Sequence, residues 1–300
     1  MTKFTLHSIA ALYLVVVCNV CFAQYPLNYF HTSSENTSFP DSARMNGHVY
    51  NGVVYSTKDH YSDNSLLIIT PKNFHPNAKV DLVFWFHGWN NNIDSALVSY
   101  GLSRQFAGSG VNAVLVLAET TKNAPDSYGG KLEKPDQFRK LVNDVLKKLY
   151  VEKILRRNCT AGKVILAGHS GAYRIMAGIL QNGNVPVNEV ILFDALYAET
   201  DKFIKWLMAD NDHRFINLYT NHGGTRDESL EMLKRLTDLK LPAYSIEEAV
   251  LTPQIVAENK ILFIHTEHEH NDIIQRPDNF GLFLDGSPFL KKLQSGNFVK

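Results

Sequence analysis

A serine stands between small residues where an apolar strand meets a helix pattern. Residues 163–174 read KVILAGHSGAYR, with Ser170 between Gly168 and Ala172, and apolar residues then recur at helical spacing over 175–180. A serine on such a sharp turn is held clear of the backbone, and the helix that follows directs its first amides toward developing negative charge. The arrangement predicts a nucleophilic serine.

Ser170 needs two partners, because a free serine hydroxyl is a poor nucleophile at neutral pH. A histidine must take its proton, and an acid must orient that histidine. The apolar strand expected at 190–193 ends directly in Asp194. In one chain order of such sites the acid follows the nucleophile and the histidine comes last. We therefore predict Asp194 as the acid, with Glu199 and Asp227 as reserve candidates.

Three histidines follow the last expected strand, 261–264, in the segment HTEHEH. His265 lies closest to the strand and is expected to be structural, whereas His268 and His270 fall in the loop beyond. We predict His270 as the base, because it lies further past the strand end and precedes a short polar turn. His268 stays open as the alternative.

The same segment also has a metal interpretation, because its imidazoles lie beside Glu267 and Glu269, and both ligand types suit zinc. The spacing matches none of the common zinc motifs well, however. We expect no metal and no cofactor.

A second pair of motifs predicts an oxyanion hole. The apolar run 80–86 is followed by His87, Gly88 and Trp89, about eighty residues before Ser170. We expect the backbone N–H groups of Trp89 and Gly171 to hold the oxyanion of a tetrahedral intermediate. Loss of one such donor typically costs ~3 kcal/mol in the barrier.

Aromatic residues near these motifs are candidates for contacting a substrate. Tyr128, Tyr173 and Tyr197 are expected beside the site, as is Trp89, with packing at the rim as the alternative role. Tyr128 belongs to the long polar loop 120–134, and such loops often form part of a pocket wall.

The elements that must position these residues alternate along the chain. Apolar runs predict strands at 49–55, 66–69, 80–86, 111–118, 164–167, 190–193, 215–219 and 261–264. Helical patterns cover 94–106, the segment after 135, the segment after 170, 203–208, 225–236 and 288–293. Thr225 to Glu228 has the form of a capping box. The alternation predicts an α/β fold with a mainly parallel sheet and helices on both faces, and such sheets bind ligands at the carboxyl ends of their strands.

From about Val49 to the C-terminus the sequence resembles the α/β-hydrolase family. The resemblance is carried by FHGW at 86–89, GHSGA at 168–172, Asp194 and a histidine after the last strand. It implies an eight-stranded sheet and hydrolysis by a Ser-His-Asp triad. Ala172 replaces the usual glycine, and the acid follows a strand one earlier than in most members, as in some lipases of the family.

The chain has 300 residues, 45% of them hydrophobic, and no formal net charge. These values predict one globular domain over 24–300, with 24–47 as an irregular lead-in, and argue against nucleic acid as a partner. Residues 1–23 have the form of a cleaved signal peptide, which predicts an exported protein without stable membrane insertion. A lipoprotein interpretation through Cys18 is weaker, because Val17 is bulky where a small residue is needed.

Three functions stay open at this point. The first is an exported carboxylesterase that acts on a small-molecule ester or acyl substrate. The second is a serine peptidase or amidase that uses the same triad. The third is a non-catalytic binding protein, against which the intact set of Ser170, Asp194 and a histidine argues.

Overall fold

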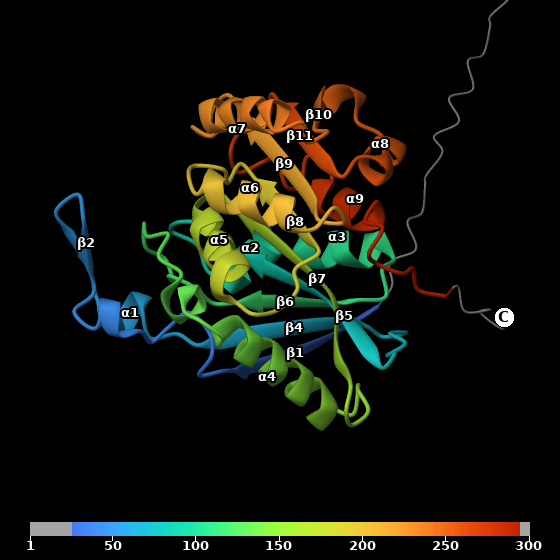
Figure 1. The fold of residues 1–300 in the computed structure, drawn as a ribbon. Coiled ribbons are helices and arrows are strands. Elements are labelled where there is room, and N and C mark those ends of the chain that lie inside the picture. Colours follow the sequence, from blue (N-terminus) through green and yellow to red (C-terminus); the bar gives the residue numbers. More distant parts are fainter. Residues whose placement is uncertain (1–25, 295–300) are drawn as a thin grey trace, which may run out of the picture.

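The computed structural model describes residues 26–294; the expected signal peptide, 1–23, lies outside them. Nine strands form the central sheet: β1 Leu27–Ser33, β4 Ser65–Pro71, β5 Lys79–Phe86, β6 Val114–Ala118, β7 Thr160–His169, β8 Glu189–Phe193, β9 Arg214–Thr220, β10 Tyr244–Glu247 and β11 Ile261–Thr266. Their order is β1-β4-β6-β5-β7-β8-β9-β11-β10 (Figure 1). A separate hairpin pairs β2 His48–Tyr50 with β3 Val53–Tyr55.

The sheet is parallel except at one edge. β1 pairs antiparallel with β4, and β4 pairs antiparallel with β6. The other neighbouring strands run parallel, and their apolar runs are buried, as expected for strands covered on both faces. The expected fold class is therefore confirmed, although the sheet has nine strands where eight were expected.

Nine α-helices are present within the described residues: α1 Thr57–His60, α2 Ile93–Ser99, α3 Leu102–Ser109, α4 Gln137–Val151, α5 Tyr173–Asn182, α6 Thr200–Ala209, α7 Arg226–Asp238, α8 Pro253–Glu258 and α9 Asn279–Asp285. Apolar residues of α4, α5, α6 and α7 pack into the core on one face of the sheet. Those of α2, α3, α8 and α9 pack on the other face. Within the described residues, no helix combines the length and the apolar character needed to cross a membrane.

Several expected elements differ at the edges of the sheet. The lead-in contains β1, which pairs with β4 along its whole length; its residues are only partly buried, so its apolar signal is weak. Residues 49–55 do not open the sheet but form the β2–β3 hairpin. The polar edge strand β10 was not expected from the sequence, because most of its side chains are exposed.

Two expected helices also differ. The helix expected at 94–106 is two helices, α2 and α3, which separate at Gly101 with φ of 57°. Residues 288–293 form no helix, and α9 is the last helix in the part of the chain that the structure describes. The apolar spacing there has another cause. Leu290 and Leu293 belong to a non-helical segment and are both buried, and the Leu293 amide donates to the Gly110 carbonyl at 2.8 Å.

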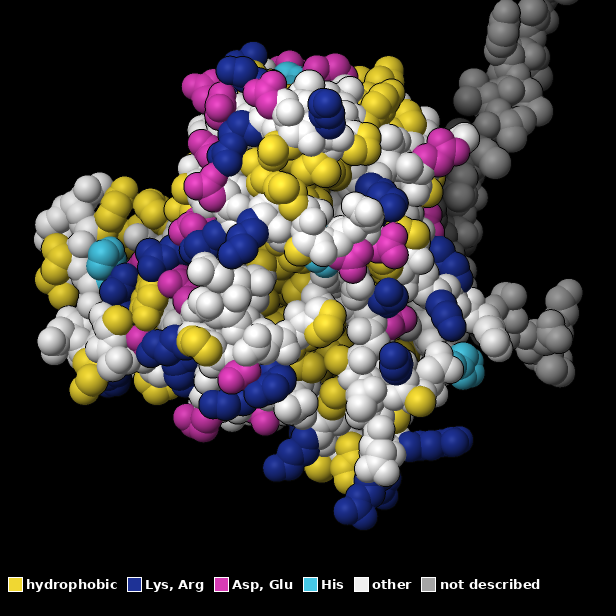
Figure 2. Space-filling model, in the orientation of Figure 1, with side chains coloured by type: hydrophobic (Ala, Val, Ile, Leu, Met, Phe, Trp, Pro, Cys, Tyr) yellow, Lys and Arg dark blue, Asp and Glu magenta, His cyan; other side chains and the backbone are white. Residues whose placement is uncertain are grey.

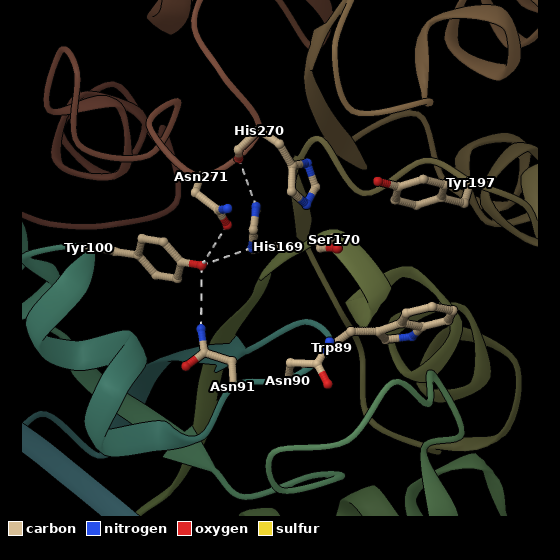
Figure 3. A pocket seen from close by; sticks show the side chains of 9 residues that line it. All are labelled: Trp89, Asn90, Asn91, Tyr100, His169, Ser170, Tyr197, His270 and Asn271. Atoms are coloured by element: carbon tan, nitrogen blue, oxygen red, sulfur yellow. Dashed lines mark hydrogen bonds between the residues drawn. The ribbon is translucent and has the colours of Figure 1, made fainter. Parts of the chain in front are cut away.

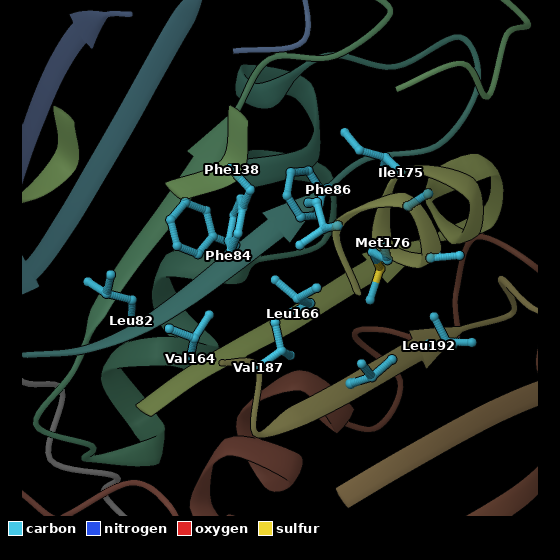
Figure 4. Packing of buried hydrophobic residues seen from close by; sticks show 14 of the residues in the cluster. Leu82, Phe84, Phe86, Phe138, Val164, Leu166, Ile175, Met176, Val187 and Leu192 are labelled. Carbon is cyan, nitrogen blue, oxygen red and sulfur yellow. The ribbon is translucent and has the colours of Figure 1, made fainter. Parts of the chain in front are cut away.

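The core fixes the strand that leads to Ser170. Figure 4 shows Phe84 and Phe86 of β5 beside Leu166 of β7, with Phe138 of α4 and Met176 of α5 closing the same cluster. Phe84 and Phe138 meet edge to face with ring centroids 4.8 Å apart. The end of β7 and the start of α5 are thus held by side chains from both neighbouring layers, which limits movement of the turn between them.

Candidate active site

Ser170 lies on a sharp turn between β7 and α5, as the sequence predicts. Its φ is 54°, and the short 3-10 turn Ser170–Ala172 leads into the helix. A β-carbon at Gly168 would lie only 2.7 Å from Ala172 Cβ and Met176 Sδ. One at Gly88 would lie 2.5 Å from Ser170 Cβ. The glycines therefore leave the space that this conformation of the serine requires.

Asp194 follows β8 directly and is completely buried, with φ of 43°. Its Oδ2 lies 2.5 Å from Nδ1 of His270. Its Oδ1 accepts a hydrogen bond from the hydroxyl of Thr225 and a longer one, 3.4 Å, from the Thr220 amide. Because Nδ1 faces the carboxylate, the other ring nitrogen of His270 is left for a second partner.

That second nitrogen is directed toward Ser170. Figure 3 shows the His270 ring beside the serine at the carboxyl end of β7. No hydrogen bond joins these two residues in the described structure, and such catalytic contacts often tighten only when substrate binds. The structure thus brings together the three residues that the sequence selects as nucleophile, acid and base.

The alternative residues lie elsewhere. His265 Nδ1 is 2.7 Å from Glu247 Oε2, and His268 Nε2 is 3.5 Å from Glu248 Oε2. Neither contacts Asp194. The reserve acids are also engaged or exposed, because Glu199 pairs with a lysine at 2.8 Å and Asp227 is exposed. In the described part of the chain, no group of three or more histidine, cysteine, aspartate or glutamate side chains could hold a metal ion.

The loop after β5 is held by a buried histidine. Nδ1 of His87 lies 2.8 Å from the Gly88 carbonyl, and its Nε2 lies 2.6 Å from Glu119 Oε1. A carbonyl only accepts, so Nδ1 carries a hydrogen, and Nε2 also lies 2.9 Å from Thr120 Oγ1. The next amide, of Trp89, and the amide of Gly171 have no partner among the described turns, loops and caps.

A cavity of about 480 Å³ opens at this place (Figure 3). Nine residues line it: Trp89, Asn90, Asn91, Tyr100, His169, Ser170, Tyr197, His270 and Asn271. Ser170, His270 and Trp89 thus share one space. Apart from Trp89 and the two tyrosines, the lining side chains are polar.

The three tyrosines selected from the sequence have different surroundings. Tyr197 lines the cavity and donates to the Gly223 carbonyl at 2.6 Å. Burial, with the nearby charge of Asp194, raises the pKa of Tyr197 to about 12. Tyr173 packs against Tyr197, with ring centroids 5.9 Å apart. Tyr128 lies outside the cavity lining and donates to an aspartate of the N-terminal segment at 3.0 Å.

A buried polar chain beside the site was not predicted from the sequence. Nε2 of His169 donates to the His270 carbonyl at 2.9 Å, so its Nδ1 accepts from the Tyr100 hydroxyl at 3.1 Å. Tyr100 in turn accepts from Asn91 at 3.3 Å. Complete burial, with a smaller effect of the His270 ring, lowers the pKa of His169 to about 3. A neutral His169 thus connects the serine turn, the loop after β5 and the loop of His270. In the sequence, only its position next to Ser170 could have pointed to this role.

Comparisons with known proteins agree with this architecture. The sequence matches no protein-family model and no curated relative. Among solved structures, a ferulic acid esterase has a TM-score of 0.56 at 11% identity, over 89% of this chain and 100% of that chain. FphF, a fluorophosphonate-binding serine hydrolase from Staphylococcus aureus, has a TM-score of 0.52 at 11% identity, over 87% and 99%.

A third similar structure is the feruloyl esterase module from Clostridium thermocellum, solved with sinapinate. Its TM-score is 0.52 at 9% identity, over 85% of this chain and 95% of that chain. These structural neighbours are serine hydrolases and esterases. At such low identity the likeness establishes the fold alone, and the chain therefore has the mixed, mainly parallel α/β fold of these hydrolases.

Proposed function

We propose that this protein is a serine hydrolase that cleaves carboxylic esters. The observation that carries the proposal is the contact of 2.5 Å between His270 and buried Asp194, beside a serine held at positive φ on a strand–helix turn. A binding protein has no need for a buried carboxylate that orients an imidazole toward a hydroxyl. The arrangement matches the requirements of an activated nucleophile.

Each residue has a defined role in this reaction. His270 takes the proton of Ser170 as its Oγ attacks the ester carbonyl, and Asp194 stabilises the imidazolium that forms. The free amides of Trp89 and Gly171 are the candidate donors to the oxyanion. His270 then gives its proton to the departing alcohol, which leaves the acyl group on Ser170. Water next attacks the acyl carbonyl while His270 takes its proton, and His270 returns that proton to Ser170 Oγ as the carboxylic acid is released.

Ester cleavage is favoured over amide cleavage because two of the fold neighbours are a ferulic acid esterase and a feruloyl esterase module. A peptidase or amidase would use the same three residues. The substrate is therefore proposed as a small-molecule ester or acyl compound, and the triad requires no cofactor.

Labelling with a fluorophosphonate probe tests the nucleophile directly. We expect the label on Ser170 in the wild-type protein and none in Ser170→Ala, with unchanged far-ultraviolet circular dichroism in both. A folded wild-type protein that takes up no label at Ser170, and that hydrolyses no activated ester, would refute the proposal. Turnover of p-nitrophenyl acetate against the matching anilide then separates ester from amide cleavage.

The choice of base has a matched control two residues away. His270→Ala should abolish hydrolysis, because it removes the only histidine that contacts Asp194 in the described residues. His268→Ala should keep most activity, because that side chain is directed to Glu248. The reverse result would move the base to His268.

We also propose that the protein is exported and that its mature form begins at Gln24. Residues 1–23 carry the sequence pattern of a signal peptide. Intact-mass analysis of the protein from its native cells is the test. A chain that retains Met1 inside the cell contradicts the proposal.

A further inference from the structure

A small hairpin projects beside the proposed active site. Strands β2 and β3 are joined by Asn51 and Gly52, whose φ values are 48° and 77°. Two left-handed residues in succession are typical of a tight turn that matches the twist of paired strands. In Figure 1 the hairpin extends away from the body of the molecule, on the side where the arrowheads of β8 and β9 lie.

The strand register gives the hairpin two distinct faces. Tyr50 pairs with Val53 next to the turn, and Val49 pairs with Val54 one position further. Successive residues of a strand point to opposite faces, so the pair Tyr50–Val53 lies on one face and the pair Val49–Val54 on the other. The Tyr50 ring meets the Trp89 ring edge to face at a centroid distance of 5.3 Å. The Tyr50–Val53 face is therefore the one that adjoins the site.

Tyr50, Val53 and Trp89 together form an exposed apolar surface, which we call the ledge. Their exposed fractions are 36%, 54% and 41%. The projecting lobe at the left of Figure 2 carries several such hydrophobic side chains. Apolar side chains that gather next to a pocket, rather than singly over the surface, are a mark of ligand contact.

Trp89 makes the ledge continuous with the cavity. Its indole Nε1 donates to Ser127 Oγ at 2.7 Å, and a β-carbon at Gly171 would lie 2.6 Å from its Cδ1. The indole is thus fixed against the residue that follows Ser170. The same side chain lines the cavity and contacts Tyr50, so a substrate that leaves the cavity on this side meets an apolar path.

The chemistry decides which part of an ester takes that path. His270 must protonate the departing oxygen, so the alcohol lies on the His270 side of Ser170. Figure 3 shows the Trp89 indole on the opposite side of Ser170, which is left for the acyl group. The cavity itself is lined mainly by polar side chains, so it gives a long acyl chain little apolar contact of its own.

We propose that the ledge is the binding subsite for an apolar acyl group, and that the preferred substrates are esters of acids too long for the cavity. This inference depends on the proposed ester hydrolysis. Each methylene that becomes buried strengthens binding by about fourfold. A chain lying on an open ledge is buried on one side only, so about twofold per methylene is expected.

The test compares kcat/KM for p-nitrophenyl acetate and p-nitrophenyl octanoate, below the concentrations at which octanoate aggregates. The wild-type ratio of octanoate to acetate should exceed about tenfold. Tyr50→Ser with Val53→Ser should reduce this ratio to near one. Val49→Ser with Val54→Ser is the matched control, because it changes two even more exposed residues of the same hairpin on the opposite face, and it should keep the wild-type ratio.

The outcomes separate the inference from the proposed function. If Ser170-dependent acetate hydrolysis is present but the wild-type ratio is near one, the ledge proposal is wrong and the proposed function stands. An equal loss of the octanoate-to-acetate ratio in both double variants refutes the ledge as well. The single variants Val53→Ser and Val54→Ser repeat the comparison of the two faces with one substitution each. If instead Tyr50→Ser with Val53→Ser changes oligomeric state or vesicle binding and leaves the ratio intact, the occupant is another copy or a lipid surface, and the proposal fails.

Discussion

Thr225→Val is the perturbation that tests most sharply how the acid is held. Thr225 and Asp194 are both completely buried, and the threonine hydroxyl donates to Asp194 Oδ1. Valine has nearly the same shape, so it removes the donor without opening a cavity. Within residues 26–294, the only other hydrogen bond to Oδ1 is the 3.4 Å bond from the Thr220 amide. The substitution therefore leaves a buried carboxylate oxygen with one long hydrogen bond.

Two effects follow, of different size. Hydrogen bonds to charged groups contribute about 1.5–3 kcal/mol, so the free energy of unfolding should fall by about 2 kcal/mol. For catalysis, only the part of the contact that strengthens in the transition state matters. The acid is retained, and only its orientation loosens, so we expect kcat to fall about tenfold, which corresponds to about 1.4 kcal/mol. KM should change little, because Thr225 does not line the cavity.

The assay measures kcat and KM on p-nitrophenyl acetate together with urea unfolding. Thr225→Ser keeps a hydroxyl and should restore most of kcat. Thr70→Val removes an equally buried hydroxyl, which accepts from Asn28 in the β1–β4 pair, and should lower stability alone. Two results would contradict this account. Either Thr225→Val keeps the wild-type kcat, or Thr225→Ser loses as much kcat as Thr225→Val.

Three further predictions concern neighbouring groups. Tyr100→Phe removes the hydroxyl that donates to His169 and should lower kcat several-fold. Tyr61→Phe removes a buried hydroxyl that has no hydrogen-bond partner among the described residues and should not lower kcat; equal kinetics of the two variants contradict this. Gly223→Ala places a methyl group against Asp194 Oδ2 and should abolish most activity, measured as the rate of fluorophosphonate labelling. Burial lowers the pKa of His169 from 6.5 to about 3, so between these values the unfolded state binds one proton more than the folded state. Stability is therefore lost as pH falls from 6.5 toward 3, by up to about 1.4 kcal/mol per pH unit. His169→Gln should flatten that slope in urea midpoints.

The centre of the fold and the catalytic residues could be predicted because their signals are local. The run from Val164 to Ala167 is continuously apolar, and small residues stand on both sides of Ser170. Burial on both faces of a parallel strand requires such a run. Asp194 and His270 could be selected because parallel strands bring their carboxyl ends to one edge, so the residues after each strand meet there.

Contacts between distant segments could not be predicted in this way. Thr225 has the sequence pattern of a capping residue, but its hydroxyl is used by Asp194, 31 positions earlier in the chain, and it caps no amide of α7. Tyr128 was expected at the pocket, but its hydroxyl donates to Asp41, 87 positions away. In both cases the local pattern gives the available hydrogen-bonding groups, and the tertiary structure decides which partner they take.

The backbone conformations of the nucleophile, Ser170, and the acid, Asp194, depend on packing by the rest of the fold. Ser170 and Asp194 each follow a strand directly and adopt positive φ, which is disfavoured for residues with a β-carbon by about 1–2 kcal/mol each. A flexible turn would relax to the common region and turn both side chains away from His270. Here β7 and β8 are buried in the core up to the residue before each turn, and Gly88 and Gly223 leave room beside the strained residues. The strain is therefore maintained by packing, and the same packing fixes the direction of the two side chains before any substrate arrives.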